Sequence, residues 1–323
     1  MARVREFHQA RWNEPVIFEL STPGERGIVA SEAEQDIQKR VGDGVSRLPD
    51  KMIRRDAPAL PEVSQMRVLK HYLHLSQGTL GADFNVDVGQ GTCTMKYSPK
   101  VNETFVRSPE ASELHPTQDD ATVQGALEIM YSLDLFLREI SGMNKFSFQP
   151  GGGSSAILAM ASIIRAYHEV RGEADTRDEI ITTIFSHPSD AAAAKVKGYK
   201  VITIREDEDG LPDFEALAGA VSKRTAGLLI TNPEDTGIFN SRIAQFTAVV
   251  RQVGGISGYD QANANGILGI TRAREAGFDM CFFNLHKTFS SPHGCGGPAC
   301  GALGVTSDLA SYLPTPVAEK TDA

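Results

Sequence analysis

The sequence predicts an α/β fold in which helices flank both faces of a largely parallel β-sheet. Two observations carry this prediction. Five short apolar runs, rich in β-branched and aromatic residues, recur between residues 180 and 283. Stretches with helical periodicity separate several of these runs. Strands that alternate with helices are typical of parallel sheets, because a parallel pair needs a long crossover connection.

Five segments are predicted to be strands and four to be helices. The strands cover residues 180–185, 199–204, 228–230, 258–260 and 278–283. Three helices cover residues 154–170, 213–221 and 242–253. The fourth follows Asp119 and Asp120, and its apolar residues recur three and four apart over residues 123–136. The two acidic residues lie at the positive end of that helix, where they stabilise it.

Composition limits the class of protein. The 323 residues include 41 acidic and 32 basic side chains, a net charge of -9, and 41% of them are hydrophobic. A chain of this kind buries a sizeable core, and its acidic balance argues against a nucleic-acid scaffold. The longest mostly apolar stretch, residues 156–164, is too short to span a membrane. Residues 1–12 lack the apolar core of a signal peptide, so we expect a cytoplasmic protein.

Cysteine usage indicates neither a disulfide scaffold nor a metal site. Four cysteines are too few to cross-link a chain of this length. Cys295 and Cys300 have His293 nearby, but the paired C-x2-C spacing of structural zinc sites is missing. We therefore expect no bound metal.

The chain divides into three predicted parts. Residues 1–115 are rich in Pro, Arg and Glu, and we expect an arm of loops and short helices at a subunit interface. Residues 116–310 carry the regular pattern and form the predicted large domain. Residues 311–323 are predicted to begin a linker.

Polar side chains follow the predicted strands at the points where they end. These side chains are His187, Asn232, Asp260, His286 and Lys287. In open α/β sheets, ligands bind beyond the carboxyl ends of the strands. These residues are therefore candidates for a functional site.

Lys287 and Asp260 together point to one cofactor. A lysine that leaves a buried strand loses solvation and part of its proton affinity, as an imine-forming amine requires. A pyridoxal phosphate enzyme needs such a lysine and also a carboxylate against the pyridine nitrogen. Taken alone, a lysine is more often a surface residue and an aspartate more often a cap or turn residue.

Two further segments fit the same cofactor. Residues 151–153 are glycines before a predicted helix, and such a turn lets backbone N–H groups approach a phosphate. His187 is a candidate to stack on the pyridine ring. An ordinary loop and a structural histidine are common alternatives. However, the order of glycine loop, His, Asp and Lys is the order expected in fold type I sites of the aminotransferase kind.

Several segments closely resemble the glycine decarboxylase P-protein family. They are residues 284–294 (NLHKTFSSPHG), residues 91–103 (GTCTMKYSPKVNE) and residues 114–127 with LHP and VQGAL. Residues 14–24 (EPVIFELSTPG) resemble the amino end of the second subunit of the two-subunit bacterial and archaeal form. The resemblance runs over nearly the whole chain.

The resemblance implies pyridoxal 5'-phosphate as the cofactor. It also implies an aminotransferase-like large domain of fold type I, with a mostly parallel seven-stranded sheet. Lys287 would form the Schiff base, Asp260 would pair with the pyridinium and His187 would stack on the ring. The other implied cofactor-binding residues are Gly152, Gly153, Ser154, Thr231, Asn232, Thr236 and His286.

The resemblance further implies a substrate and partners. Glycine would lose its carboxylate as CO2, and its aminomethyl group would pass to the lipoyl group of a separate H-protein. This is the reaction of glycine dehydrogenase (decarboxylating). A paralogous subunit 1 would complete a hetero-oligomer, and neither nucleic acid nor membrane is an expected partner. Because family members continue into a small carboxy-terminal domain, residues 311–323 would begin the linker to a domain that is absent here.

Departures from the family pattern leave other functions open. Residues 149–156 (QPGGGSSA) stand where the family reads more like QPAAGAHG, and residues 188–191 (PSDA) replace the usual GTNP. Asp190 is expected to add a negative charge near an anionic cofactor, which disfavours binding. One alternative is another fold type I enzyme, such as an amino-acid decarboxylase or a cysteine desulfurase with Cys93 or Cys295 as sulfur acceptor. The other is a non-catalytic subunit that binds a partner.

Overall fold

The computed structural model describes residues 13–56, 58–78, 99–291 and 299–321. The chain forms two compact units, residues 1–85 and 86–323. The boundary between them lies inside the segment predicted as an arm. The predicted bounds of the arm, the large domain and the linker, at residues 115 and 310, stay predictions.

The first unit consists of short elements joined by loops, as its proline content predicts. Its described helices are α1 Gln35–Val41 and α2 Gln65–Gly78, with single 3-10 turns η1 Ile17–Leu20, η2 Gly44–Arg47 and η3 Asp50–Met52. The carboxylate of Glu14 contacts Nδ1 of His71 at 2.9 Å and Nδ1 of His74 at 2.7 Å. These hydrogen bonds lower the pKa of Glu14 and hold the start of the described chain against α2.

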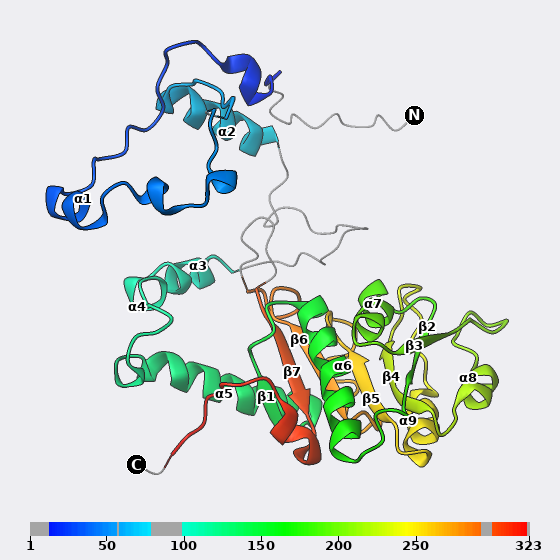
Figure 1. Cartoon of the computed structure of the whole chain (residues 1–323). Helices are drawn as coiled ribbons and strands as arrows, with labels where there is room; N and C mark the ends of the chain where they lie inside the picture. The colour runs from blue at the N-terminus through cyan, green and yellow to red at the C-terminus, as the bar shows by residue number, and fades with distance from the viewer. Residues whose placement is uncertain (1–12, 57, 79–98, 292–298, 322–323) are drawn as a thin grey trace, which may run out of the picture. The chain divides into compact units, whose positions relative to one another are not determined.

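The second unit is an α/β domain built on a seven-stranded sheet (Figure 1). Its strands are β1 Lys145–Ser147, β2 Glu179–Thr183, β3 Lys200–Ile204, β4 Thr225–Thr231, β5 Ile256–Asp260, β6 Met280–Asn284 and β7 Gly301–Val305. Its described helices are α3 Lys100–Val106, α4 Pro109–Ser112, α5 Gln124–Ser141, α6 Gly153–Val170, α7 Pro188–Val196, α8 Phe214–Ala220 and α9 Ile243–Gln252, with 3-10 turns η4 Asp120–Thr122 and η5 Ser307–Tyr312.

The strand order is β1-β7-β6-β5-β4-β2-β3. Strands β3, β2, β4, β5 and β6 pair in parallel, whereas β7 runs antiparallel to both of its neighbours. The predicted fold class, a mostly parallel seven-stranded sheet of the fold type I kind, is confirmed. All five predicted strands are present. Strands β1 and β7 and helix α7 were not predicted from the sequence.

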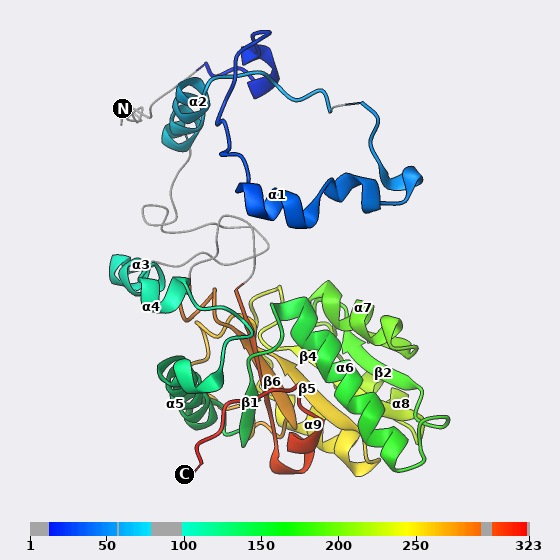
Figure 2. The same cartoon turned by 60° about the vertical axis from the view of Figure 1, so that its left-hand side comes forward.

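Helices cover both faces of the sheet (Figure 2). One face packs against α6, α7 and η5, and the other packs against α5, α8 and α9. Strand β4 illustrates the arrangement, because Leu228 contributes to the core on one face and its neighbour Leu229 to the core on the other. Both are fully buried. A strand covered on both faces reads as a continuous apolar run, as residues 228–230 do.

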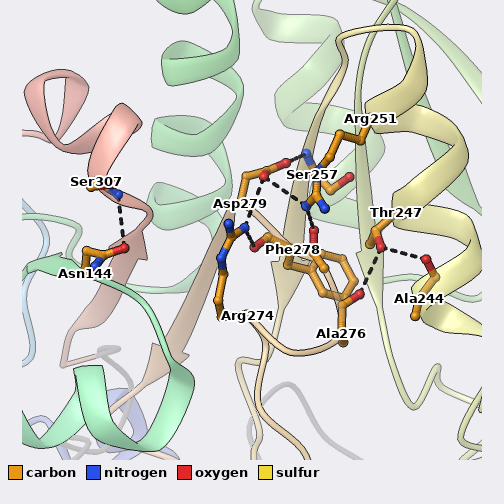
Figure 3. A network of polar contacts seen from close by, with 11 residues as sticks. Asn144, Ala244, Thr247, Arg251, Ser257, Arg274, Ala276, Phe278, Asp279 and Ser307 are labelled. Carbon is orange, nitrogen blue, oxygen red and sulfur yellow. Dashed lines mark hydrogen bonds and ion pairs between the residues drawn. The ribbon is translucent and has the colours of Figure 1, made fainter.

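A polar network ties β5, β6 and α9 together at the amino end of the two strands (Figure 3). Asp279 precedes β6 and accepts a hydrogen bond from the backbone N–H of Ser257 at 2.8 Å. It also accepts one from Arg251 of α9 at 3.2 Å and lies 3.6 Å from Arg274. Burial raises the pKa of Asp279 despite these partners. The network fixes the register of β6 against β5, and therefore the position of whatever follows β6.

Removal of the Asp279 side chain should destabilise the domain. In Asp279→Ala the buried N–H of Ser257 loses its acceptor, which costs about 1–3 kcal/mol of unfolding free energy. Urea denaturation of the full chain measures this loss. Asp36→Ala is the matched control, since Asp36 is 91% exposed in a surface pair with Lys39 and such pairs contribute little. Equal stability of the two variants would contradict the anchoring role of Asp279.

No helix among the described residues is both long enough and apolar enough to cross a membrane.

Candidate active site

The carboxyl ends of four neighbouring parallel strands bring predicted site residues to one edge of the sheet. His187 follows β2, Thr231 ends β4, Asp260 ends β5 and Lys287 lies three residues beyond β6. Thr231 and Asp260 are register partners, and Asp260 pairs in turn with Phe282 of β6. The strand pairing therefore places in adjacent positions residues that are up to a hundred positions apart in sequence.

Asp260 is a buried carboxylate near Lys287 and His187. Its side chain is 4% exposed, and Oδ1 accepts a hydrogen bond from the backbone N–H of Ala262 at 2.9 Å. Burial raises its pKa, while the hydrogen bond from Ala262 and the charges of His187 and Lys287 act in the opposite direction. A carboxylate held in this way is suited to pair with a cation that enters the site.

His187 is held by the start of helix α7. Its Nδ1 accepts a hydrogen bond from the backbone N–H of Ser189 at 3.2 Å and lies 2.7 Å from the Ser189 hydroxyl. Its own backbone N–H donates to Thr231 Oγ1 at 3.3 Å. An Nδ1 atom that accepts from the backbone leaves the ring proton on Nε2. These contacts fix the orientation of the imidazole ring through one of its two nitrogens.

The glycine-rich turn is packed tightly against the ends of β6 and β7. Gly152 is the N-cap of α6 and Gly153 its first residue, and no side chain caps this helix. A Cβ atom on Gly153 would lie 2.9 Å from Nδ2 of Asn284, and one on Gly301 would lie 2.5 Å from the carbonyl oxygen of Gly152. The first amides of a helix have no partner within it. The start of α6, including Ser154, therefore presents free N–H groups beside β6.

Two glycines of this turn, Gly151 and Gly153, allow a direct test of this packing. Gly153→Ala forces the Asn284 amide to move, and overpacking of this kind typically costs about 1–3 kcal/mol. Gly151→Ala is the matched control, because a Cβ atom there meets nothing within 4 Å. Urea denaturation should show a loss of stability for Gly153→Ala and little change for Gly151→Ala. Equal effects would mean that the turn does not need glycine at residue 153.

The remaining predicted residues differ in how closely they approach this edge. Thr231 receives the His187 N–H and lies among the site residues. The Asn232 side chain is buried and bonds the backbone of Asn240 in both directions, at 2.8 and 3.2 Å, so it holds the following loop closed. Thr236 is exposed in that loop. His286 is buried, and its Nδ1 accepts from the N–H of Ala299 at 3.2 Å.

The structure adds acidic residues that were not predicted as site residues. Asp190 of α7 is fully buried, and Thr231 Oγ1 donates to its Oδ2 at 3.5 Å. Glu234 is buried against the hydroxyl of Thr183, which in turn lies 2.7 Å from the Ser186 hydroxyl. Burial raises the pKa values of both Asp190 and Glu234. Asp190 was expected near the cofactor from its place in the segment after His187, whereas for Glu234 only its position just past a strand indicated proximity to the site.

The cysteine and metal hypotheses concern residues that lie mostly outside the described part of the chain. No group of three or more metal-binding side chains gathers in that part of the chain. Cys281 is buried within β6, and burial raises its pKa above the ordinary thiol range. Cys93, His293 and Cys295 lie outside the described residues.

The side chains at the strand ends and the start of α6 together fit pyridoxal phosphate. Asp260 would supply a buried carboxylate for a ring nitrogen, the start of α6 would supply uncapped N–H groups for a phosphate, and Lys287 would supply an amine beyond the adjacent strand. Asn284 Oδ1, between the turn and the Lys287 segment, is buried without a hydrogen-bond partner. These features define a pyridoxal-phosphate protein of fold type I.

A family model narrows this class. The model for aminotransferase class-V matches residues 148–309, half of the chain, and the chain belongs to that family. The matched segment runs from the glycine-rich turn through β7, so it contains His187, Asp260 and Lys287. Pyridoxal phosphate is the cofactor of this family.

Curated relatives carry a more specific name. The chain is 45% identical over 311 residues to a probable glycine dehydrogenase (decarboxylating) subunit 2 of Pyrococcus horikoshii, covering 96% of this chain and 60% of the relative. The values for the protein of the same name in Thermococcus kodakarensis are identical. The Halalkalibacterium halodurans protein is 42% identical over 308 residues, covering 95% of this chain and 62% of the relative. The chain thus spans about three fifths of the length of these relatives.

Solved structures agree on the fold. A glycine decarboxylase (P-protein) of the glycine cleavage system, in inhibitor-bound form, superposes with a TM-score of 0.71 at 18% identity. The match covers 89% of this chain and 65% of that one. A sphingosine-1-phosphate lyase from Burkholderia pseudomallei superposes with a TM-score of 0.60 at 17% identity. At these identities the likeness concerns the fold alone.

Proposed function

We propose that this chain is the cofactor-binding part of a glycine dehydrogenase (decarboxylating) subunit 2. The observation that carries the proposal is that the strand pairing brings His187, the buried Asp260 and Lys287 to the same end of the parallel strands. It occurs in a chain 45% identical over 96% of its length to proteins of that name. The substrate is glycine, and its aminomethyl group passes to the lipoyl group of an H-protein. A paralogous subunit 1 completes the enzyme, and the proposed location is the cytoplasm.

Each site residue has a proposed task. Lys287 would hold the cofactor covalently and exchange protons with the substrate amine, and Asp260 would keep the ring nitrogen protonated. His187, whose orientation is fixed by Ser189, would stack on the ring. The start of α6, with Gly152, Gly153 and Ser154, binds the phosphate, and Thr231, Thr236 and His286 line the site. When bound, pyridoxal phosphate supplies an electron sink for the carbanion that loss of CO2 leaves.

The packing of the site supports a role for the protein in excluding water. Asp260, Asn232 and His286 are each at most 5% exposed, so the polar groups beyond the strand ends lie in a low-dielectric environment. Electrostatic interactions are stronger there than in water. A cation that enters this site is therefore held by Asp260 more firmly than by a surface carboxylate.

The decisive experiment measures exchange of labelled bicarbonate into the carboxyl group of glycine. The chain is combined with a co-expressed sister subunit, lipoylated H-protein and pyridoxal phosphate. We expect exchange that depends on all four components. Cofactor uptake without exchange in the complete mixture would favour the non-catalytic subunit, and turnover of cysteine in place of glycine would favour a desulfurase.

A further inference from the structure

Asp190 is a buried carboxyl group that the proposed function does not use. It is the third residue of helix α7 and is 0% exposed. Its Oδ1 is buried without a hydrogen-bond partner. Its Oδ2 has one partner, the Thr231 hydroxyl at 3.5 Å, near the upper limit for a hydrogen bond. A helix start favours negative charge only modestly, whereas burial without a counter-ion strongly disfavours it.

Asp190 and Asp260 lie close enough for their charges to interact. Asp190 lies in α7 after β2, Asp260 ends β5, and β4 lies between these two strands. Thr231 at the end of β4 links them, since it contacts Asp190 and is the register partner of Asp260. The other acidic group acting on both is Asp235, in the loop after β4. The interactions with His187 and Lys287 act on Asp260 in the opposite direction. Two ionised carboxylates at this edge would repel each other with little water to screen them.

The surroundings distinguish the two carboxyl groups. Asp260 accepts a backbone hydrogen bond at 2.9 Å and interacts favourably with Lys287 and His187. Asp190 has one long hydrogen bond and negative neighbours. Burial and Asp260 accordingly hold the pKa of Asp190 well above its ordinary range. The ionised form is therefore better stabilised at Asp260.

We propose that Asp190 and Asp260 share one proton, so that Asp190 is the neutral member and Asp260 carries the single negative charge of the pair. The negative charge then lies at Asp260, where the proposed function places a protonated ring nitrogen. The role of this charge in cofactor binding rests on the proposed function, but the shared proton is a property of the chain without cofactor. It replaces the expectation of a negative charge at Asp190.

The pH dependence of stability tests the shared proton without any cofactor. An unfolded aspartate titrates near pH 3.9, and a raised pKa in the folded state makes the fold less favourable as the pH rises above that value. Asp190→Asn keeps the size and removes this effect. We therefore expect the Tm of the full chain with Asp190→Asn to exceed that of the wild type, by an amount that grows from pH 5 to pH 8. A gain of at least ~2 °C at pH 8 is expected.

The matched control is Asp213→Asn at the N-cap of α8. Asp213 accepts the same kind of helix-start bond, from the N–H of Ala216 at 3.1 Å, and asparagine caps a helix about as well as aspartate. Its effect on Tm should not grow between pH 5 and pH 8. If Asp190→Asn lowers the Tm at pH 8, fails to fold, or shifts it equally at all pH values, the proposal is overturned.

Infrared spectroscopy detects the proton directly. The wild-type chain, with carbon-13 in its aspartate carboxyl groups, should show the C=O band of a protonated carboxylic acid at pH 7. Asp190→Asn should weaken that band, and Asp213→Asn should leave it unchanged. Absence of the band in the wild type, or a band that Asp190→Asn does not change, overturns the proposal.

Cofactor binding separates this proposal from the proposed function. Asp190→Asn preserves one negative charge at the pair, so it should take up pyridoxal phosphate as the wild type does. If the wild type shows the shared proton but takes up no cofactor, the proposed function fails and the proton pair stands. If cofactor is taken up and no protonated aspartate is found, the opposite holds.

Discussion

Replacement of Lys287 by alanine should abolish the visible absorbance of protein-bound pyridoxal phosphate. It should also lower the glycine–bicarbonate exchange rate by roughly 10²–10⁴-fold, the contribution typical of a group that transfers protons in a reaction. Lys287 lies beyond the buried strand β6, with its backbone N–H bonded to the Asn284 carbonyl at 3.0 Å. No other lysine follows a strand next to Asp260 in the described residues. The measurements are an absorbance spectrum and the exchange assay in the complete mixture.

Lys195→Ala is the control for this prediction. Lys195 is an exposed lysine in the last turn of α7, and its removal should change neither spectrum nor exchange. An absorbance band that survives in Lys287→Ala would assign the covalent link to another residue. A band lost equally in both variants would show that the effect is not specific to Lys287.

We expect Asp260→Asn to weaken cofactor binding without lowering the stability of the fold. Loss of a charged hydrogen bond worth ~1.5–3 kcal/mol should weaken cofactor retention about tenfold to a hundredfold. Because burial raises the pKa of Asp260, its charge opposes folding above pH 4, and the neutral variant should have a Tm at pH 8 equal to or above that of the wild type. Equilibrium dialysis with pyridoxal phosphate and thermal unfolding measure the two effects.

Asp279→Asn is the matched control for Asp260→Asn. Asp279 is also a mostly buried aspartate with a raised pKa, but it lies at the amino end of the same pair of strands. Asparagine there still accepts the Ser257 N–H, and cofactor retention should be unchanged. If both variants lost the cofactor equally, general disturbance of β5 and β6 would explain the result better than pairing with the ring nitrogen.

The sequence predicted the strands that have a distinct local pattern. Residues 199–204 and 278–283 are β-branched or aromatic, and they appear as β3 and β6. Strand β1 has only three residues, too few for any periodicity, and β7 reads GALGV, whose two glycines are typical of a loop. The glycines of β7 follow from tertiary packing, because a Cβ on Gly304 would lie 2.3 Å from the Phe146 ring. The local pattern of apolar and polar residues does not indicate such a contact.

Helix α7 was missed for a related reason. It begins at Pro188, and four of the eight residues that follow are alanine. Proline is well suited to the first position of a helix, but a run of alanines has little amphipathic signal. The helix matters for the site because its first turn orients His187 and buries Asp190.

The order of site residues along the chain was predictable, whereas their use of hydrogen bonds was not. His187, Asp260 and Lys287 each follow a recognisable apolar run, and a parallel sheet necessarily brings such ends together. Asn232 occupies an equivalent position in sequence, but its amide bonds the backbone of Asn240 eight residues away. That pairing depends on the path of the loop between them, which no local pattern specifies.

The position of β7 between β1 and β6 has a consequence for biosynthesis. The turn that starts α6 follows β1, and it is held beside β6 through β7, with the Gly301 N–H bonded to the Pro150 carbonyl at 2.8 Å. A nascent chain that ends after β6 already contains His187 and Asp260, but it lacks the strand against which the glycine-rich turn packs. The glycine-rich turn can therefore reach its place beside β6 only after β7 has been synthesised. Until then β1 has no partner strand and β6 has one unpaired edge.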